Sequence, residues 1–97
     1  MEKLVRVSMQ GPLTSKNWTN KNNENVVINS VNLLLTDGVD SFVAEATDQL
    51  ALQLSAKPLL RDYLYNAQCR IEVREWKNKD GETVQKNVIR LLKIQAI

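Results

Sequence analysis

Two tryptophans with lysines close to them are the residues of this chain best suited to binding chemistry. They are Trp18, with Lys16 and Lys21 on either side, and Trp76, followed by Lys77 and Lys79. An indole ring stacks on the flat face of any nucleic-acid base, and nearby lysines attract the phosphates. The pattern therefore predicts a site that binds single strands without reading their sequence.

Four further side chains are candidates for the same site, from the strands expected around it. They are Arg6, Phe42, Arg74 and Lys86. Residues 70–93 carry seven basic side chains against four acidic ones, and a locally basic surface favours a polyanionic partner. Structural interpretations stay open: Trp76 could cap the fold, Trp18 could pack under its loop or in a dimer interface, and Phe42 could belong to the core.

The composition excludes several kinds of catalytic and metal site. With no histidine and one cysteine, the chain cannot form a Ser-His-Asp set, a Cys-His pair or a Cys/His zinc site. It has no glycine-rich phosphate loop and no carboxylate pair at a catalytic spacing. The acidic residues Asp37, Asp40, Glu45 and Asp48 are interpreted as solubility and capping groups. We therefore expect no enzyme activity, no cofactor and no metal.

Length and composition are those of one small domain. The 97 residues are 43% hydrophobic, which suits a single core over residues 1–97. One cysteine permits no intrachain disulfide, as is usual in a reducing cytosol. The N-terminal MEKLVRV lacks the apolar run of a signal peptide, and no segment reaches the roughly 18 apolar residues of a membrane span. We expect a soluble, cytoplasmic protein associated with the nucleoid.

Hydrophobic periodicity predicts three strands, then a helical segment, then a hairpin. The expected strands are Lys3–Gln10, Val26–Leu35, Val39–Ala46, Cys69–Trp76 and Val84–Ile94, and the expected helices are Asp48–Ala56 and Leu59–Tyr65. Thr47 with Asp48 is typical of a helix N-cap, and Pro58 is expected to begin the second helix. Thr36-Asp37-Gly38 predicts a two-residue hairpin turn, and Asn78–Gly81 predicts the second turn. The polar segment Gly11–Asn25 has no periodicity and is expected to be an extended, mobile loop.

The expected order, β-β-β-α-β-β, is that of the OB-fold, a five-stranded partly open barrel. We expect an all-β fold in which the helix between the third and fourth strands plugs one end of the barrel. OB-folds bind their ligands across the second and third strands, between the first-second and fourth-fifth loops. Trp18 and Trp76 fall in those two loops. The alternative architecture is an open α+β sheet with the helix on one face.

Several residues after Val39 carry a resemblance to a known family. They are the helical run LALQLSAKPLLRDYLYNAQ, the strand IEVREW over Ile71–Trp76, and the hairpin Lys79-Asp80-Gly81. In these the chain resembles the bacterial single-stranded DNA-binding proteins. It departs from that pattern where charged residues replace a glycine of the fourth strand, and where the chain ends at Ile97 without an acidic tail. The resemblance points to a tail-less relative of primosomal or phage type.

Two functions stay open on the sequence alone. The resemblance implies a non-catalytic protein that binds single-stranded DNA, with RNA as the alternative ligand, in replication, recombination or repair. Replication or recombination proteins are the expected partners. A homodimer or homotetramer is expected as well, because a small barrel benefits from partners and one barrel covers only about 4–16 nucleotides. The second function is an OB-fold protein-interaction module without nucleic-acid binding, in which the tryptophans anchor a partner protein.

Overall fold

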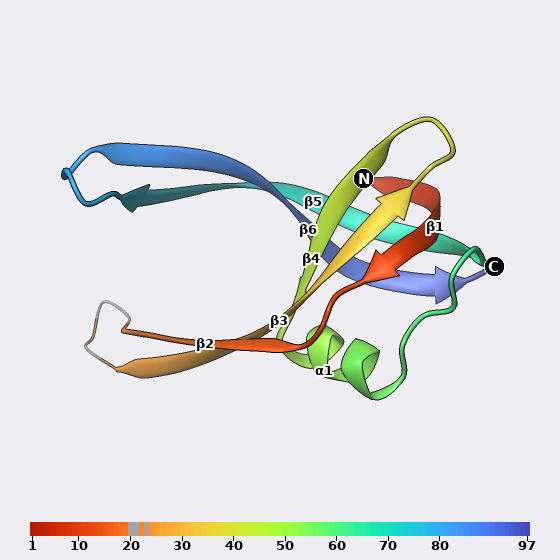
Figure 1. Cartoon of the computed structure of the whole chain (residues 1–97), viewed down its shortest axis with the longest axis horizontal. Helices are drawn as coiled ribbons and strands as arrows, with labels where there is room; N and C mark the ends of the chain where they lie inside the picture. The colour runs from red at the N-terminus through yellow and green to blue at the C-terminus, as the bar shows by residue number, and fades with distance from the viewer. Residues whose placement is uncertain (20–21, 23) are drawn as a thin grey trace.

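Six strands and one helix make up the described part of the chain. The computed structural model describes residues 1–19, 22 and 24–97, without the side chains of Trp18, Thr19 and Trp76. The elements are β1 (Glu2–Gln10), β2 (Thr14–Thr19), β3 (Asn25–Thr36), β4 (Ser41–Thr47), α1 (Asp48–Ala56), β5 (Leu64–Lys77) and β6 (Thr83–Ala96). Five of these strands close a barrel, and β2 extends its sheet beside β3 (Figure 1).

The first strand closes the barrel because it pairs with two others. Its first half, Glu2–Arg6, pairs with β5, and its second half, Arg6–Gln10, pairs with β3. The strands therefore run in the order β1-β5-β6-β4-β3 and return to β1, with β4 and β6 parallel and the other neighbours antiparallel. This arrangement confirms the predicted all-β, OB-like barrel, and the open α+β sheet is wrong.

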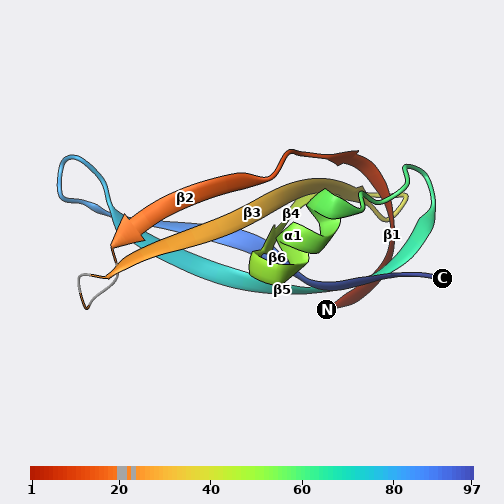
Figure 2. The ribbon, with the colours of Figure 1, turned by 90° about the horizontal axis from the view of Figure 1, so that it is seen from below.

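The helix α1 lies across one end of the barrel, below β3 and β4 (Figure 2). Its bounds confirm the predicted helix Asp48–Ala56, and it buries Ala51 and Leu54. Thr47 holds the N-cap position, but its side chain makes no capping hydrogen bond. At the other end, the Gln10 side chain donates a hydrogen bond to the Leu54 carbonyl oxygen at 2.9 Å, which ties the last turn to β1.

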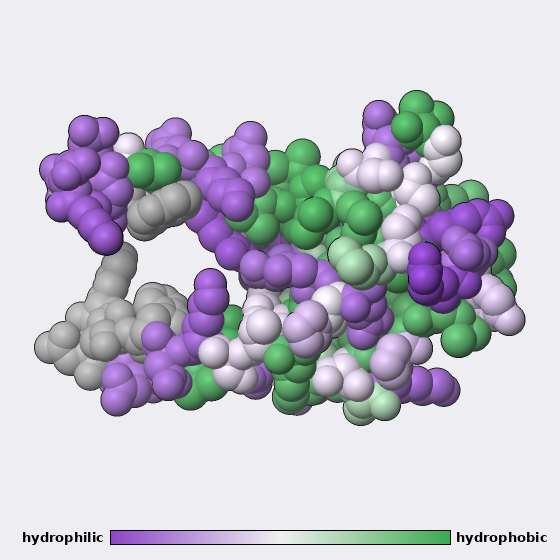
Figure 3. Space-filling view, in the orientation of Figure 1, coloured by the Kyte–Doolittle hydropathy of each residue, from purple (hydrophilic) through white to green (hydrophobic). Residues whose placement is uncertain are grey.

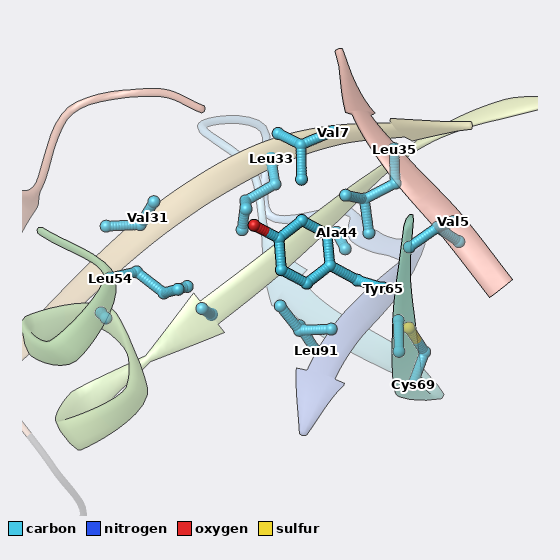
Figure 4. Close-up of a cluster of buried hydrophobic side chains, with 13 residues drawn as sticks. Val5, Val7, Val31, Leu33, Leu35, Ala44, Leu54, Tyr65, Cys69 and Leu91 are labelled. Atoms are coloured by element: carbon cyan, nitrogen blue, oxygen red, sulfur yellow. The ribbon is translucent and has the colours of Figure 1, made fainter. Parts of the chain in front are cut away.

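The core fills the barrel with side chains from β1, β3, β4, α1, β5 and β6 (Figure 4). Its buried members are Val5, Val7, Val31, Leu33, Leu35, Ala44, Ala46, Ala51, Leu54, Tyr65, Ala67, Cys69 and Leu91. Cys69 is buried, and burial raises the pKa of its thiol. Met9 is 62% exposed whereas Val5 and Val7 are buried, because the register of β1 shifts between Val7 and Met9.

The predicted helix Leu59–Tyr65 is wrong. The segment after α1 is irregular until β5 begins. Side chains take its backbone donors: the Leu59 N–H bonds to Gln10 Oε1 at 3.1 Å, and the Leu60 N–H bonds to the Tyr65 hydroxyl oxygen at 3.0 Å. A stretch of one or two turns is too short to form a stable helix against such competition.

The predicted loop Gly11–Asn25 is wrong over Thr14–Thr19, which forms β2 and pairs with Asn25–Ser30 of β3. Hydroxyl and amide groups link the two strands, since Ser15 Oγ lies 2.6 Å from Asn29 Oδ1 and Thr14 Oγ1 lies 3.0 Å from Ser30 Oγ. The exposed side chains of β2 gave no alternation of apolar and polar residues. Residues 20, 21 and 23 of this segment lie outside the described residues.

Both predicted hairpins are present. The connection of β3 to β4 spans residues 37–40, four residues instead of the predicted two. The Asp37 carboxylate accepts bonds from the backbone N–H groups of Val39 and Asp40, at 2.9 and 2.8 Å. In the β5–β6 turn, Asn78 Oδ1 accepts from the N–H groups of Asp80 and Glu82, both at 3.0 Å. These side chains fix turns that are longer than a two-residue hairpin.

Candidate nucleic-acid interface

Two hairpins extend beyond the barrel on the same side, and a cleft lies between them (Figure 1). The first arm consists of β2 and Asn25–Ser30 of β3, and the second arm consists of Arg70–Lys77 of β5 and Thr83–Arg90 of β6. Two adjoining hollows of about 630 and 530 Å³ lie between them and share Lys16, Glu45 and Arg74. Together these hollows are called the cleft below.

Strand alternation explains which side chains line the floor of the cleft. On β4, the buried Ala44 and Ala46 point into the barrel, so Glu45 and Thr47 lie on its outer face. On β3 the same alternation leaves Ser30 and Asn32 outside, and on β6 it leaves Arg90 outside. In the space-filling view, this floor between the arms is largely hydrophilic (Figure 3). The outer face of β3, β4 and β6 thus carries the polar groups of the cleft.

The structure brings three of the predicted binding residues together. Lys16 of β2, Arg74 of β5 and Lys86 of β6 all line the cleft. The backbone of Trp18 lies opposite Val26, and that of Trp76 lies opposite Val84, but both indole side chains lie outside the description. The whole of Lys21 also lies outside the described residues.

Four other predicted residues do not line the cleft. Lys77 and Lys79 are exposed at the tip of the β5–β6 arm. Phe42 is half-buried and packs against the core, with the Lys3 ammonium 5.8 Å from the centre of its ring. Arg6 lies on β1, where its guanidinium donates a hydrogen bond to the Asp62 carbonyl oxygen. Phe42 and Arg6 thus have structural contacts away from the arms.

The cation at the centre of the cleft, Arg74, is already paired. Its guanidinium donates two hydrogen bonds to the Glu45 carboxylate, at 2.7 and 3.3 Å. The hydrogen bonds to Glu45 raise the pKa of Arg74, so the guanidinium stays charged. The earlier interpretation of Glu45 as a solubility or capping group is wrong, because it binds a cleft arginine across 29 residues of sequence.

Beside this pair, Glu72 contacts three arginines. Its carboxylate lies 2.6 Å from Arg70, 3.3 Å from Arg90 and 3.9 Å from Arg74. The hydrogen bond from Arg70, and then that from Arg90, lower the pKa of Glu72. Arg90 also donates to the Thr47 hydroxyl at 2.9 Å. The arginines are therefore held by carboxylates, whereas no ion pair within the described residues involves Lys16 or Lys86.

Glu45, Thr47 and Asn32 are cleft residues that sequence reasoning missed. One signal could have found them, since Ala44 and Ala46 are the small inward residues of an alternating strand. Residues between and beside them, such as Glu45 and Thr47, then have to face outward.

A search of protein-family models found none that matches this chain, and a search of curated proteins found no matching relative. Within the residues that the structure describes, no helix is both long enough and apolar enough to cross a membrane. Function is therefore inferred from the cleft and its side chains.

Proposed function

We propose that this chain is a non-catalytic single-stranded DNA-binding protein that holds the strand in the cleft. The observation that carries the proposal is the position of the cleft, over the outer face of β3 and β4 and between the two arms. OB barrels bind oligonucleotides on this face, between the corresponding loops. The proposed role lies in replication, recombination or repair in the cytoplasm, with replication or recombination proteins as partners.

The charges of the cleft suit a strand that runs between the arms. Lys16 on the first arm and Lys86 on the second are the cleft lysines, and no described carboxylate pairs with either. Each phosphate that a lysine neutralises releases about 0.7 of a counterion from a single strand. Two such contacts give a plot of log K against log salt with a slope of about −1.4.

The backbone positions of the two tryptophans are consistent with base stacking in the cleft. Residues two apart on a strand belong to the same face of a sheet. Trp18 is two residues beyond Lys16, and Trp76 is two residues beyond Arg74, so each backbone position shares a strand face with a residue that lines the cleft. In the proposal each ring stacks on one base, which supplies about 1–3 kcal/mol per base.

The proposal also includes a homodimer or homotetramer. One OB barrel covers only about 4–16 nucleotides, so linked barrels would hold a longer strand.

The test is a titration of the protein with oligo-dT while tryptophan fluorescence is recorded at several salt concentrations. We expect strong quenching at low salt and an affinity that falls with salt along the slope given above. A parallel titration with oligo-U compares RNA with DNA. Absence of quenching at low salt would contradict the proposal.

A second candidate function rests on exposed apolar side chains near the second arm. Ile71 and Val73 of β5 are 61% and 64% exposed, and they belong to the same face of the strand. Exposed apolar residues grouped on one region are typical of a protein interface. A protein-interaction module predicts no quenching by oligo-dT, together with loss of partner binding after Ile71→Ser or Val73→Ser.

A further inference from the structure

Arg74 is held in the cleft by a group that a phosphate could replace. Both hollows of the cleft are lined by Arg74 and by its partner Glu45. The guanidinium donates its two hydrogen bonds at 2.7 and 3.3 Å to the two oxygens of one carboxylate. The same planar fork of donors matches two oxygens of a phosphate.

The accessibility of this pair argues against a purely structural role. The Arg74 side chain is 41% exposed and the Glu45 side chain is 21% exposed. Ion pairs with this degree of contact with water contribute little to folding, because water and salt screen the attraction. An incoming phosphate therefore does not have to break a strong bond.

We propose that Glu45 occupies, in the free protein, an anion site that takes a phosphate of the bound strand. The inference rests on the proposed function and names one contact within it. When the strand enters, the Arg74 guanidinium exchanges the Glu45 carboxylate for a phosphodiester. The released carboxylate stays in the cleft, where it repels any phosphate that is out of place and so favours bases at that position.

The neighbouring carboxylate explains why Arg74 is the arginine that exchanges. Glu72 lies 3.9 Å from Arg74, too far for a hydrogen bond but near enough to keep the guanidinium in place after the exchange. Arg90 is held more closely, by Glu72 at 3.3 Å and by the Thr47 hydroxyl at 2.9 Å. Arg70 does not line the cleft. The exchange thus concerns one guanidinium and one carboxylate.

Glu45→Gln is the central variant of the test, because it removes the charge and keeps the shape of the side chain. We expect oligo-dT to bind about fivefold more tightly, since the phosphate no longer competes with a carboxylate for the guanidinium. The slope of log K against log salt should be the same in wild type and Glu45→Gln, about 0.7 steeper than the two lysines alone give, because Arg74 holds one phosphate in both complexes. Arg74→Gln should remove the gain when the two substitutions are combined.

The matched control is Glu75→Gln. Glu75 also lines the cleft, but its carboxylate accepts a hydrogen bond from the Gln85 amide at 3.1 Å and pairs with no arginine in the described structure. The substitution makes the same change in net charge without releasing Arg74. Its effect on affinity should be smaller than that of Glu45→Gln and should persist in the Arg74→Gln background.

The outcomes separate the inference from the proposed function. Wild-type protein that does not bind oligo-dT overturns the proposed function and this inference with it. Wild-type protein that binds, with a Glu45→Gln gain that persists without Arg74 or is matched by Glu75→Gln, overturns the inference alone. Thermal unfolding checks that each variant is folded. If Glu45→Gln unfolds, Arg74→Gln alone replaces it: the salt slope should become shallower by about 0.7, because one phosphate contact is lost, and an unchanged slope overturns the inference.

Discussion

The two arms that enclose the cleft are built by different means. The β5–β6 arm continues a ladder of thirteen register pairs, from Tyr65 opposite Ala96 to Lys77 opposite Thr83. The β2–β3 arm has six pairs, and β2 has a neighbouring strand on one side only. Glu72 and Arg74 form ion pairs at the base of the longer arm, whereas hydroxyl and amide groups link the strands of the shorter one.

The difference in ladder length suggests that the two arms contribute differently to binding. A longer ladder leaves less freedom to a residue at its end, so less entropy is lost when that residue binds a ligand. The shorter arm has fewer contacts, so its local opening costs less free energy. We therefore expect the β5–β6 arm to supply the firmer contact and the β2–β3 arm to adapt to the strand.

The largest expected effect is on affinity, from removal of either indole. Trp76→Ala should weaken oligo-dT binding by about 1–3 kcal/mol, and Trp18→Ala should cost less within that range, because Trp18 belongs to the shorter arm. Fluorescence anisotropy of labelled oligo-dT measures both affinities without relying on tryptophan.

Tyr63→Ala is the control for these substitutions, since Tyr63 is an exposed aromatic residue between α1 and β5 and does not line the cleft. Equal losses for the two tryptophans would remove the proposed difference between the arms. No loss in either variant would mean that the strand does not stack on these rings.

The next effect concerns the turn at the tip of the longer arm. Gly81 has a φ of +77°, and no atom lies within 4 Å of the position that a Cβ would take. Gly81→Ala should therefore lower the free energy of unfolding by about 1 kcal/mol through backbone strain alone. Because the strain lies in the arm, affinity for oligo-dT should fall as well.

Gly38 provides a matched substitution outside the arms. Its φ is +96°, it also has no atom near the Cβ position, and it lies in the β3–β4 turn away from the cleft (Figure 1). Gly38→Ala should cost about the same stability and leave affinity unchanged. Denaturant unfolding and anisotropy test both variants, and a loss of affinity in Gly38→Ala would contradict the placement of the site.

The two arms also differ in how well their strands could be predicted from the sequence alone. The longer arm was predicted because Cys69, Ile71 and Val73 alternate with charged residues and because Asp80-Gly81 is a strong turn signal. The strand β2 was not predicted, because its described side chains, Thr14–Asn17, are all polar and exposed and the strand is held by pairing with β3.

In the site, the sequence placed Arg74 and Lys86 in the correct strands, whereas Lys16 was expected in a loop and lies in β2. It could not show that Arg74 meets Glu45, because that contact depends on the register of three strands in the closed barrel. The residues that share one face of a strand can be predicted from the sequence, but the residue that each of them contacts on another strand of the barrel cannot.

A smaller effect is expected from single hydrogen bonds in each arm. Ser15→Ala removes the bond to Asn29, and Gln85→Ala removes the bond to Glu75. Each bond is exposed, so each loss should change the free energy of unfolding by only about 0.5 kcal/mol. Hydrogen exchange should nevertheless accelerate along β2 after Ser15→Ala, and hardly along β6 after Gln85→Ala, because β6 has the longer ladder. Equal acceleration in both arms would contradict the comparison.

The smallest effect distinguishes the turn of the longer arm from the β3–β4 turn by pH. Both use a side-chain oxygen to accept two backbone N–H bonds, from Asn78 in the arm and from Asp37 in the other turn. Only Asp37 titrates. The backbone N–H groups of Asp40 and Val39, followed by the Lys3 side chain, lower its pKa from 3.8 to about 2. A lowered folded-state pKa stabilises the fold above the unfolded-state value and ceases to do so as pH falls through the folded-state value.

Asp37→Asn tests this, because an asparagine keeps an oxygen for the turn but carries no charge. The difference in Tm between wild type and Asp37→Asn should be constant above about pH 4 and should disappear as the pH falls to about 2. Asn78→Ala should lower Tm by an amount that does not change over the same range, because an amide does not titrate. Glu72 titrates in every variant and cancels in each difference. A Tm difference for Asp37→Asn that is the same at neutral pH and in acid would show that the Asp37 charge contributes nothing, and that the two turns are equivalent.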